Sequence, residues 1–362
     1  MVVKVGTNVV TGRDGRLDRR VLLRLARQMV AVRNAGIDLS LVASGAIGAG
    51  MGELELPERP RDLPHLQAVA AVGQARLVRM FNEVFRKHGL HAAQLLLTRD
   101  DFENRTRYLN IRNTIRALHD LGAVPIINEN DTVGIDEIRY GDNDIIAAMV
   151  ANLLRADLLI LLSAVDGLIV RTPDGKAGVV DLVKRIDRKV TSLVDGTRSS
   201  LGAGGMGAKL EAIRMVTKAG EVAVIANGKR PNVISHILNG EKIGTLFLPH
   251  PSKLSAKRRW IGMSVRPRGR IIIDTGAAKA LMRSGRSLLT IGITGVEGQF
   301  RKGDVVCIVG PEGRELARGL VNYNVRDLLR IKGLRSDRIA SELGQKLYDE
   351  AVHRDNMTIL GK

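Results

Sequence analysis

The amino-acid sequence predicts an α/β protein with a mainly parallel central sheet, followed by a smaller β-rich domain. Up to residue 226, short apolar runs without polar alternation are separated by amphipathic segments of helical period. This pattern is typical of parallel strands that are buried on both faces. After residue 268 the chain changes to short strands with frequent glycine, which is typical of a small barrel or sandwich. The sequence therefore predicts a first domain at 1–250, a basic linker at 251–268 and a second domain at 269–356.

The individual elements follow from the same patterns. Apolar runs predict strands and 3.6-residue periodicity predicts helices, while clustered glycines predict loops. In the first domain we expect strands at 2–5, 37–43, 91–97, 124–127, 157–163 and 222–226, and helices at 17–32, 66–88, 105–121, 145–155 and 207–218. Glycine-rich loops are expected at 44–52 and 201–206, and strands of the second domain at 271–273, 288–290, 304–309 and 316–320.

Composition limits the classes of protein to which the chain can belong. Hydrophobic residues make up 44% of the 362 residues and aromatic residues only 3%, so a large core must be aliphatic. The single cysteine, Cys307, excludes an internal disulfide and a cysteine metal cluster. No apolar stretch reaches 18 residues, so we expect no membrane span and no signal peptide, and a cytoplasmic location.

The net charge of +18 is unevenly distributed along the chain. Residues 251–362 carry 22 basic and 11 acidic side chains, against 34 and 27 in the first 250 residues. A basic second domain suits nucleic acid or another anionic ligand. An arginine-rich proteome would produce the same bias, so both explanations stay open.

Two polar clusters mark the strongest candidate site. Asn128–Asp131 follows the apolar run at 124–127, and Gly141–Asp144 precedes the apolar segment at 145–154. Ligand sites of open α/β sheets form at this kind of strand end, between a strand and the next helix. The alternative is a solvated loop with an ordinary helix cap. Two clusters around one loop favour a ligand site.

Two lysines and two glycine-rich segments add possible anion contacts. Lys4 interrupts an otherwise apolar strand, where a charge requires a partner or an outlet to solvent. Ser44 begins a glycine-rich stretch after a strand, which is either an anion-binding loop or a tight turn. The segment Gly202–Gly207 precedes Lys209, but it lacks the preceding strand of a dinucleotide fingerprint and the Gly-Lys-Ser/Thr of a phosphate-binding P-loop. A glycine-rich segment of this kind is typical of a helix start that binds phosphate. The alternative is that Lys209 is an ordinary solvated lysine.

Together these residues indicate phosphoryl transfer. The chain shows no Ser-His-Asp or Cys-His grouping and no histidine spacing that suits a metal. Phosphoryl transfer depends mainly on positioning and charge neutralisation, which lysines and glycine loops provide. A carboxylate acceptor is already ionised at neutral pH, so the reaction needs no general base.

The motifs occur in the order and spacing of a known family. Val3–Thr7, Ala43–Ile47, Asn128–Asp131, Gly141–Asp144 and Gly204–Lys209 resemble those of glutamate 5-kinase, in the amino-acid kinase superfamily. The C-terminal part, with Ala351–Asp355 near its end, resembles the PUA domain of the bacterial enzymes. The resemblance implies a three-layer α/β/α sandwich with a mainly parallel sheet, plus a PUA-like barrel domain.

The resemblance also implies a reaction and residue roles. ATP would phosphorylate the side-chain carboxylate of L-glutamate to L-glutamyl 5-phosphate, the first step of proline biosynthesis, with Mg²⁺ bound to the nucleotide and no metal site on the protein. Lys4 and Lys209 would be catalytic and Asp144 would position them, while Ser44, Asp131 and Asn143 would bind glutamate. The nucleotide would contact Lys4, Ser163, Ala164, Ala203, Gly204, Gly205, Met206, Gly207, Ala208 and Lys209.

The sequence departs from the family on the nucleotide side. Ala164 stands where the family usually has an acid, Ile169 where an aromatic residue is usual, and Gly207–Ala208 where hydroxyl residues are common. Asp166 is not a replacement, because the family carries an acid there as well. We therefore expect an active kinase with weaker or altered nucleotide binding.

The remaining expectations concern partners and alternatives. The family likeness implies inhibition by proline and a homo-oligomer, and the basic PUA domain suits RNA. One alternative function is RNA binding through the PUA domain with a vestigial kinase fold, although aromatic residues for base stacking are scarce there. Another is an amino-acid kinase that acts on a different carboxylate substrate, against which the two polar clusters argue.

Overall fold

The computed structural model describes residues 1–12, 14–134, 143–171, 177–187, 190–191, 205–250, 256–345 and 348–360. The chain divides into two compact units, Met1–Lys253 and Leu254–Lys362. Each unit has its own hydrophobic core.

The first unit contains an eight-stranded sheet in the order β3-β4-β2-β1-β5-β9-β10-β8. The first six strands of this order, from β3 across to β9, run parallel to one another. Strand β10 is antiparallel to β9, and β8 runs parallel to β10. The strands are β1 (Val2–Val5), β2 (Ser40–Ala43), β3 (His91–Leu97), β4 (Ala123–Glu129), β5 (Leu158–Ser163), β8 (Leu182–Val183), β9 (Val222–Asn227) and β10 (Thr245–Phe247), with a separate hairpin of β6 (Ile169–Arg171) and β7 (Ala177–Val179). The predicted mainly parallel sheet is confirmed.

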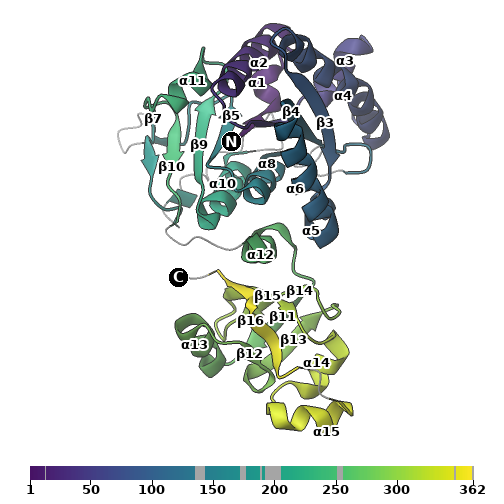
Figure 1. Ribbon diagram of the computed structural model, residues 1–362, viewed down its shortest axis with the longest axis vertical. Helices are drawn as coiled ribbons and strands as arrows, with labels where there is room; N and C mark the ends of the chain where they lie inside the picture. Colours follow the sequence, from purple (N-terminus) through teal and green to yellow (C-terminus); the bar gives the residue numbers. More distant parts are fainter. Residues whose placement is uncertain are drawn as a thin grey trace. The chain divides into compact units, whose positions relative to one another are not determined.

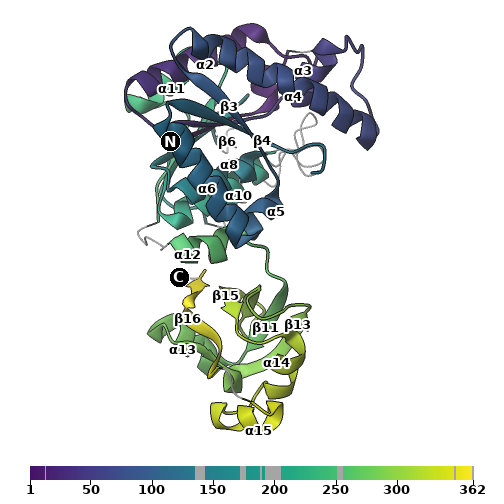
Figure 2. The same ribbon diagram turned by 45° about the vertical axis from the view of Figure 1, so that its right-hand side comes forward.

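Helices cover both faces of this sheet. Figures 1 and 2 show α2, α3, α4 and α11 on one face and α6, α8 and α10 on the other. The helices of the unit are α1 (Thr7–Val10), α2 (Arg19–Asn34), α3 (Ala46–Glu53), α4 (Leu63–Arg86), α5 (Arg99–Glu103), α6 (Arg105–Asp120), α8 (Asn143–Leu154), α10 (Met206–Ala219) and α11 (Val233–Leu238). The result is the three-layer α/β/α sandwich that the family resemblance implies.

Alternation along β1 decides which residues meet which helices. Val3 and Val5 belong to the core formed with α2 and α4. Because successive strand side chains point to opposite faces, Lys4 points to the other face, towards α8 and α10. Nearly all of α8 is buried, from Asn143 to Leu153, which is expected of a helix that is apolar all round.

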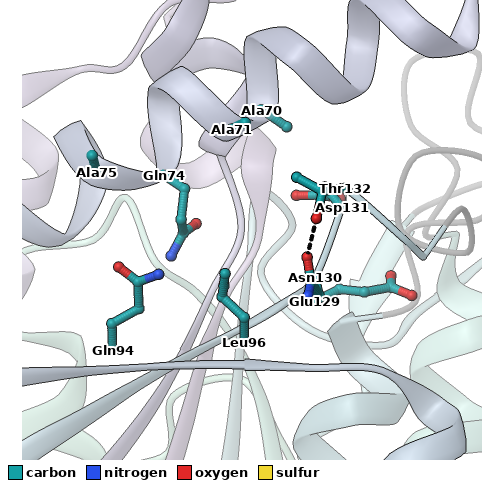
Figure 3. Close-up of a pocket in the computed structure, with 10 residues that line it drawn as sticks. All are labelled: Ala70, Ala71, Gln74, Ala75, Gln94, Leu96, Glu129, Asn130, Asp131 and Thr132. Atoms are coloured by element: carbon teal, nitrogen blue, oxygen red, sulfur yellow. Dashed lines mark hydrogen bonds between the residues drawn. The ribbon is translucent and has the colours of Figure 1, made fainter.

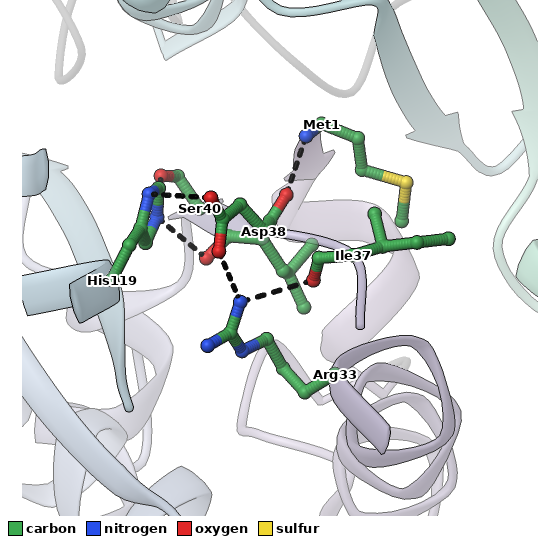
Figure 4. Close-up of polar contacts among 7 residues, drawn as sticks. Met1, Arg33, Ile37, Asp38, Ser40 and His119 are labelled. Atoms are coloured by element: carbon green, nitrogen blue, oxygen red, sulfur yellow. Dashed lines mark hydrogen bonds and ion pairs between the residues drawn. The ribbon is translucent and has the colours of Figure 1, made fainter. Parts of the chain in front are cut away.

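Polar contacts tie α2, β2 and α6 together at the amino end of the sheet (Figure 4). Arg33 Nη1 donates to Asp38 Oδ1 at 2.6 Å and to the Ile37 carbonyl at 3.1 Å. The imidazole Nε2 of His119 lies 3.1 Å from Ser40 Oγ and 3.2 Å from the Leu39 carbonyl. These contacts hold the start of β2 at the edge opposite the polar clusters.

The second unit is built on a six-stranded sheet in the order β12-β16-β15-β14-β11-β13, in which only β11 and β14 run parallel. Its strands are β11 (Gly269–Ile273), β12 (Leu288–Leu289), β13 (Ile293–Gly298), β14 (Val305–Val309), β15 (Glu315–Val321) and β16 (Glu350–Ile359). Its helices are α12 (Ala256–Arg259), a π-helix (Trp260–Ser264), α13 (Thr275–Ser284), α14 (Val325–Ile331), α15 (Ile339–Leu343) and 3₁₀ turns at Thr290–Gly292 and Ser336–Arg338. The β-rich second domain is confirmed.

Several elements differ from the sequence prediction. Residues 46–53, expected as a glycine loop, form α3, and only Gly45 before it has a positive φ, of 110°. The strands β13 and β16 and the helices α13 and α14 were not predicted, because glycine and polar residues interrupt their apolar pattern. Residues 256–264, expected within a linker, form helices that contact β15 and β16. They therefore lie within the second unit.

Cys307 lies on β14 and is half-buried. Burial, together with the neighbouring Glu315 carboxylate, raises the pKa of its thiol to about 12. The thiol stays protonated at neutral pH, which agrees with a packing role rather than a reactive one.

Candidate functional site

The site forms where the parallel strands of the first unit end side by side. Val5 on β1 pairs with Ala43 on β2 and with Leu162 on β5, and Val42 pairs with Ile127 on β4. Parallel strands in register present their carboxyl ends at one edge. The residues that follow these positions, including Ser44 and Asn128, are therefore neighbours although they are far apart in the sequence.

Two lysines from distant parts of the chain share one carboxylate at this edge. Lys4 Nζ lies 2.8 Å from Asp144 Oδ1, and Lys209 Nζ lies 2.9 Å from Asp144 Oδ2. Lys4 comes from β1, Asp144 from the first turn of α8 and Lys209 from the first turns of α10. The structure thus brings together the three residues expected to be catalytic.

The charges of this triad are strongly coupled because all three side chains are buried. Asp144 is fully buried, and Lys4 and Lys209 are 4% and 8% exposed. Burial by itself would raise the pKa of Asp144, but the two ammonium groups and their hydrogen bonds outweigh it and lower that pKa below the ordinary 3.8. Two cations and one anion leave a net positive charge, which suits a phosphate group.

A chain of buried amides lies beside the triad. Asn143 Nδ2 donates to Ser44 Oγ at 2.9 Å and to Asn128 Oδ1 at 2.8 Å. Asn128 Nδ2 in turn donates to Gln74 Oε1 on α4 at 2.9 Å. Because Asn143 precedes Asp144 on α8, the amide chain and the lysine triad are anchored at the same helix start.

Asp131 lies near Gln74, at the other end of this chain of amides. It is 8% exposed and follows β4, where its N–H donates to the Glu129 carbonyl at 3.0 Å. It lines a hollow of about 200 Å³ together with Gln74. In Figure 3 the hollow lies between α4, strand β3 and the residues after β4, with Gln74 pointing into it. A carboxylate and amides in one hollow suit a small polar molecule that carries an ammonium group.

The residues expected to contact the nucleotide are placed only in part. Ser163 ends β5 beside Asn227 of β9, and Ala164 after it is exposed. Gly205 is the residue before α10, so Met206, Gly207 and Ala208 form its first turn, and Lys209 follows. Ala203, Gly204, Gly141 and Asp142 lie outside the described residues.

Comparisons with known proteins identify the relatives of this chain. The amino acid kinase family matches residues 1–227 and the PUA domain matches residues 269–343. The glutamate 5-kinase of Caldanaerobacter subterraneus subsp. tengcongensis is 46% identical over 99% of this chain and 97% of its own. Those of Moorella thermoacetica and Pseudomonas putida are 46% and 44% identical, over 100% and 99% of this chain and 96% and 97% of their own.

The chain belongs to the glutamate 5-kinase family. The resemblance noted in the motifs is confirmed, and it extends over nearly the whole chain. RNA binding by a vestigial kinase is not favoured, because the relatives are named as kinases over both units.

Sequence reasoning singled out Asn128 as part of a cluster but gave it no role, and it missed Gln74. A signal for Gln74 was present: in α4 it occupies the same stripe as the buried Ala70 and Leu77, four residues before and three after it. A polar residue in an apolar stripe requires a buried partner.

No helix in the described part of the chain is long and apolar enough to cross a membrane. Within the same ranges, no three His, Cys, Asp or Glu side chains are grouped in a way that suits a metal ion.

Proposed function

We propose that the protein transfers the γ-phosphoryl group of ATP to the side-chain carboxylate of L-glutamate, which yields L-glutamyl 5-phosphate and ADP as the first step of proline biosynthesis. The observation that carries this proposal is the pair of buried lysines on Asp144, directly beside the amide chain of Asn143 and Ser44. The family of the chain supports it.

In this reaction a carboxylate oxygen of glutamate forms a bond to the γ-phosphorus, and the bond from that phosphorus to the β,γ-bridging oxygen breaks. The acceptor has an ordinary pKa of about 4.3 and is ionised at neutral pH, so no proton has to be removed. The protein must hold two anions together and neutralise charge on the moving group. Lys4 and Lys209 supply the positive charge, and Asp144 fixes where the two ammonium groups lie.

Glutamate is assigned to the amide side of the site. The hydroxyl of Ser44 suits a carboxylate, whereas the amide oxygen of Asn143 and the carboxylate of Asp131 suit the α-ammonium group. Ser163, Ala164 and residues 203–209 are assigned to the nucleotide. Backbone N–H groups at the start of α10 favour a phosphate there.

Magnesium is assigned to the nucleotide. Asp144 is engaged by two lysines, so its charge positions them, and phosphate oxygens are the hard ligands that Mg²⁺ prefers. When bound, the ion would neutralise charge on the β- and γ-phosphates.

A coupled assay of ADP release tests the proposed function. L-Glutamate, L-aspartate and N-acetyl-L-glutamate are compared under the same conditions, and hydroxylamine traps any acyl phosphate. We expect ADP release and hydroxamate formation with L-glutamate at a kcat/KM at least tenfold above the other two. Faster turnover of aspartate or acetylglutamate would assign the chain to another carboxylate kinase.

The nucleotide side has its own test. Loss of one hydrogen bond to a ligand costs on the order of 1 kcal/mol, or several-fold in affinity. The alanine at 164 and the Gly207–Ala208 pair should therefore weaken ATP binding without abolishing it. A calorimetric titration with millimolar ATP should show saturable binding, and its absence would contradict an active kinase.

Four further features of the protein are predictions: inhibition by proline, self-association, RNA binding and a cytoplasmic location. Family membership supports competition by proline for the glutamate pocket and self-association of the chain. The PUA domain, with its basic surroundings, supports RNA as a partner. A cytoplasmic location suits a biosynthetic kinase that uses ATP.

A further inference from the structure

We infer that Gln74 is a positioning residue for the glutamate site: its amide oxygen orients Asn128, which orients Asn143 against Ser44. This inference rests on the proposed function, because it assigns glutamate to Asn143 and Ser44. In the sequence, Gln74 lies on α4, outside the strand-end motifs that identify the family.

The amide group of Asn143 has both of its hydrogens committed. One is donated to Ser44 Oγ and the other to Asn128 Oδ1, and an amide nitrogen carries only two. Because Ser44 Oγ accepts this bond, its own hydrogen can be donated to a substrate carboxylate. In this arrangement Asn128 must therefore present its amide oxygen, and not its NH₂ group, to Asn143.

Asn128 can meet that requirement in only one orientation of its amide. Its Oδ1 accepts from Asn143 Nδ2 at 2.8 Å and from the Glu129 N–H at 2.9 Å. A flipped amide would present its NH₂ group to both of these donors. Donors that face each other in a buried site are left without hydrogen bonds, which strongly disfavours the flipped amide.

Gln74 favours the required orientation from the other side. Its Oε1 accepts from Asn128 Nδ2 at 2.9 Å, so a flip of Asn128 would also set two oxygens against each other. Gln74 is 7% exposed, and its Nε2 has no hydrogen-bond partner among the described residues. Its contribution to this network is therefore the acceptor oxygen.

The packing of α4 holds Gln74 in place. The preceding residue, Gly73, lies so close to α3 that an added Cβ would come within 1.9 Å of the Ala46 carbonyl oxygen. The backbones of α3 and α4 are thus in direct contact at the turn that carries Gln74. Figure 3 shows the Gln74 side chain extending from α4 into the hollow that Asp131 also lines.

The test compares three variants in the ADP-release assay, with glutamate and ATP titrated separately. Gln74→Met keeps the length of the side chain and removes the acceptor, so we expect the KM for glutamate to rise roughly five- to tenfold. The KM for ATP and kcat should change less than about twofold. Gln74→Glu retains an acceptor oxygen and should keep the KM for glutamate within about threefold of the unmodified protein.

Gln28→Met is the matched control. Gln28 is a buried glutamine on α2 whose Oε1 accepts from the Ile234 N–H at 3.0 Å, and it takes no part in the amide chain. The same substitution there removes a buried acceptor outside the site, so it should leave all three constants unchanged. Thermal unfolding of each variant shows whether the fold is intact.

The outcomes separate the possible explanations. An unchanged KM for glutamate in Gln74→Met, or an equal loss for glutamate and ATP, would reduce Gln74 to a packing residue. If Gln74→Met does not fold, Gln74→Glu decides, because a KM for glutamate raised more than tenfold despite the acceptor would contradict the inference. No glutamate-dependent ADP release by the unmodified protein would overturn the proposed function itself, and this inference with it.

Discussion

At the scale of single residues, the site depends on charges and amides that are buried with their partners. Lys4 looked anomalous in a buried strand, and its partner proves to be Asp144, 140 residues further along the chain. Burying an ammonium group is tolerable only with such a counter-ion. The residue that stabilises the two lysines is thus also the residue that aligns them.

Replacing Asp144 should harm both stability and catalysis. In Asp144→Asn two buried lysines lose their counter-ion, which costs about 3–5 kcal/mol of unfolding free energy, and kcat should fall roughly 10²- to 10³-fold. Urea unfolding and the ADP-release assay measure the two effects. Glu342→Gln, which removes the half-exposed ion pair to Arg330, should cost less than about 1 kcal/mol. A normal kcat in Asp144→Asn would exclude Asp144 from the mechanism.

His119 predicts a pH dependence of stability. Burial lowers the pKa of its imidazole below 6.5, although the nearby Asp38 opposes this shift. The unfolded chain therefore binds a proton at a higher pH than the folded protein does. The resulting stability is present above pH 6.5 and is lost as the pH falls from 6.5 through the folded pKa.

The measurement is urea unfolding at pH 7.5 and at pH 5.5. The unmodified protein should lose more unfolding free energy on acidification than His119→Gln, which cannot be protonated. Equal losses in the two proteins would show that another group causes the acid sensitivity.

At the scale of elements, the close contact of α3 and α4 holds one wall of the site. Both Gly50 and Gly73 have no room for a side chain: an added Cβ would lie 1.9 Å from the Val69 and Ala46 carbonyl oxygens, respectively. These obstacles are backbone atoms, which cannot move aside without separating the helices.

Gly73→Ala should therefore force α3 and α4 apart. We expect a loss of about 3 kcal/mol of unfolding free energy, at the upper end of the cost of overpacking, and a raised KM for glutamate because Gln74 follows directly. Gly52→Ala on α3 is the control, since an added Cβ there meets nothing within 4 Å. A helical alanine in place of this glycine should be neutral or stabilising by up to about 1 kcal/mol. Equal stability of the two variants would argue against the close contact.

At the scale of the whole molecule, each of the two units has a hydrophobic core of its own among the residues that the structure describes. One packs β1, β2 and their neighbours against α2 and α4, and the other lies in the second unit around β11 and β14. Separate cores allow each unit to unfold in its own transition.

Core substitutions should reveal these two transitions. Phe81→Ala in the first core and Ile308→Ala in the second each remove a fully buried side chain, at a cost of about 3–5 and 2–5 kcal/mol, respectively. Differential scanning calorimetry should show each variant lowering a different transition. A single transition that both variants lower equally would show that the two units unfold together.

Much of the fold was predictable because it depends on short-range patterns. Buried parallel strands appear as unbroken apolar runs, and helices such as α2 and α6 have clear periodicity and Asx residues at their starts. The prediction failed where tertiary packing overrides local preference. Residues 46–53 contain three glycines, which disfavour a helix by themselves, yet close packing against α4 requires glycine at position 50.

The α/β class, the change of architecture near residue 268 and the likeness to glutamate 5-kinase could all be predicted from the sequence, because these depend on residue types and their spacing. Which residues meet depends on how the strands and helices pack in three dimensions. Lys4 and Lys209 share one carboxylate because β1 lies between β2 and β5, and because α8 and α10 cover the same face of the sheet. Gln74 reaches Asn128 because α4 packs against that edge, and no local pattern records a contact between side chains 54 residues apart.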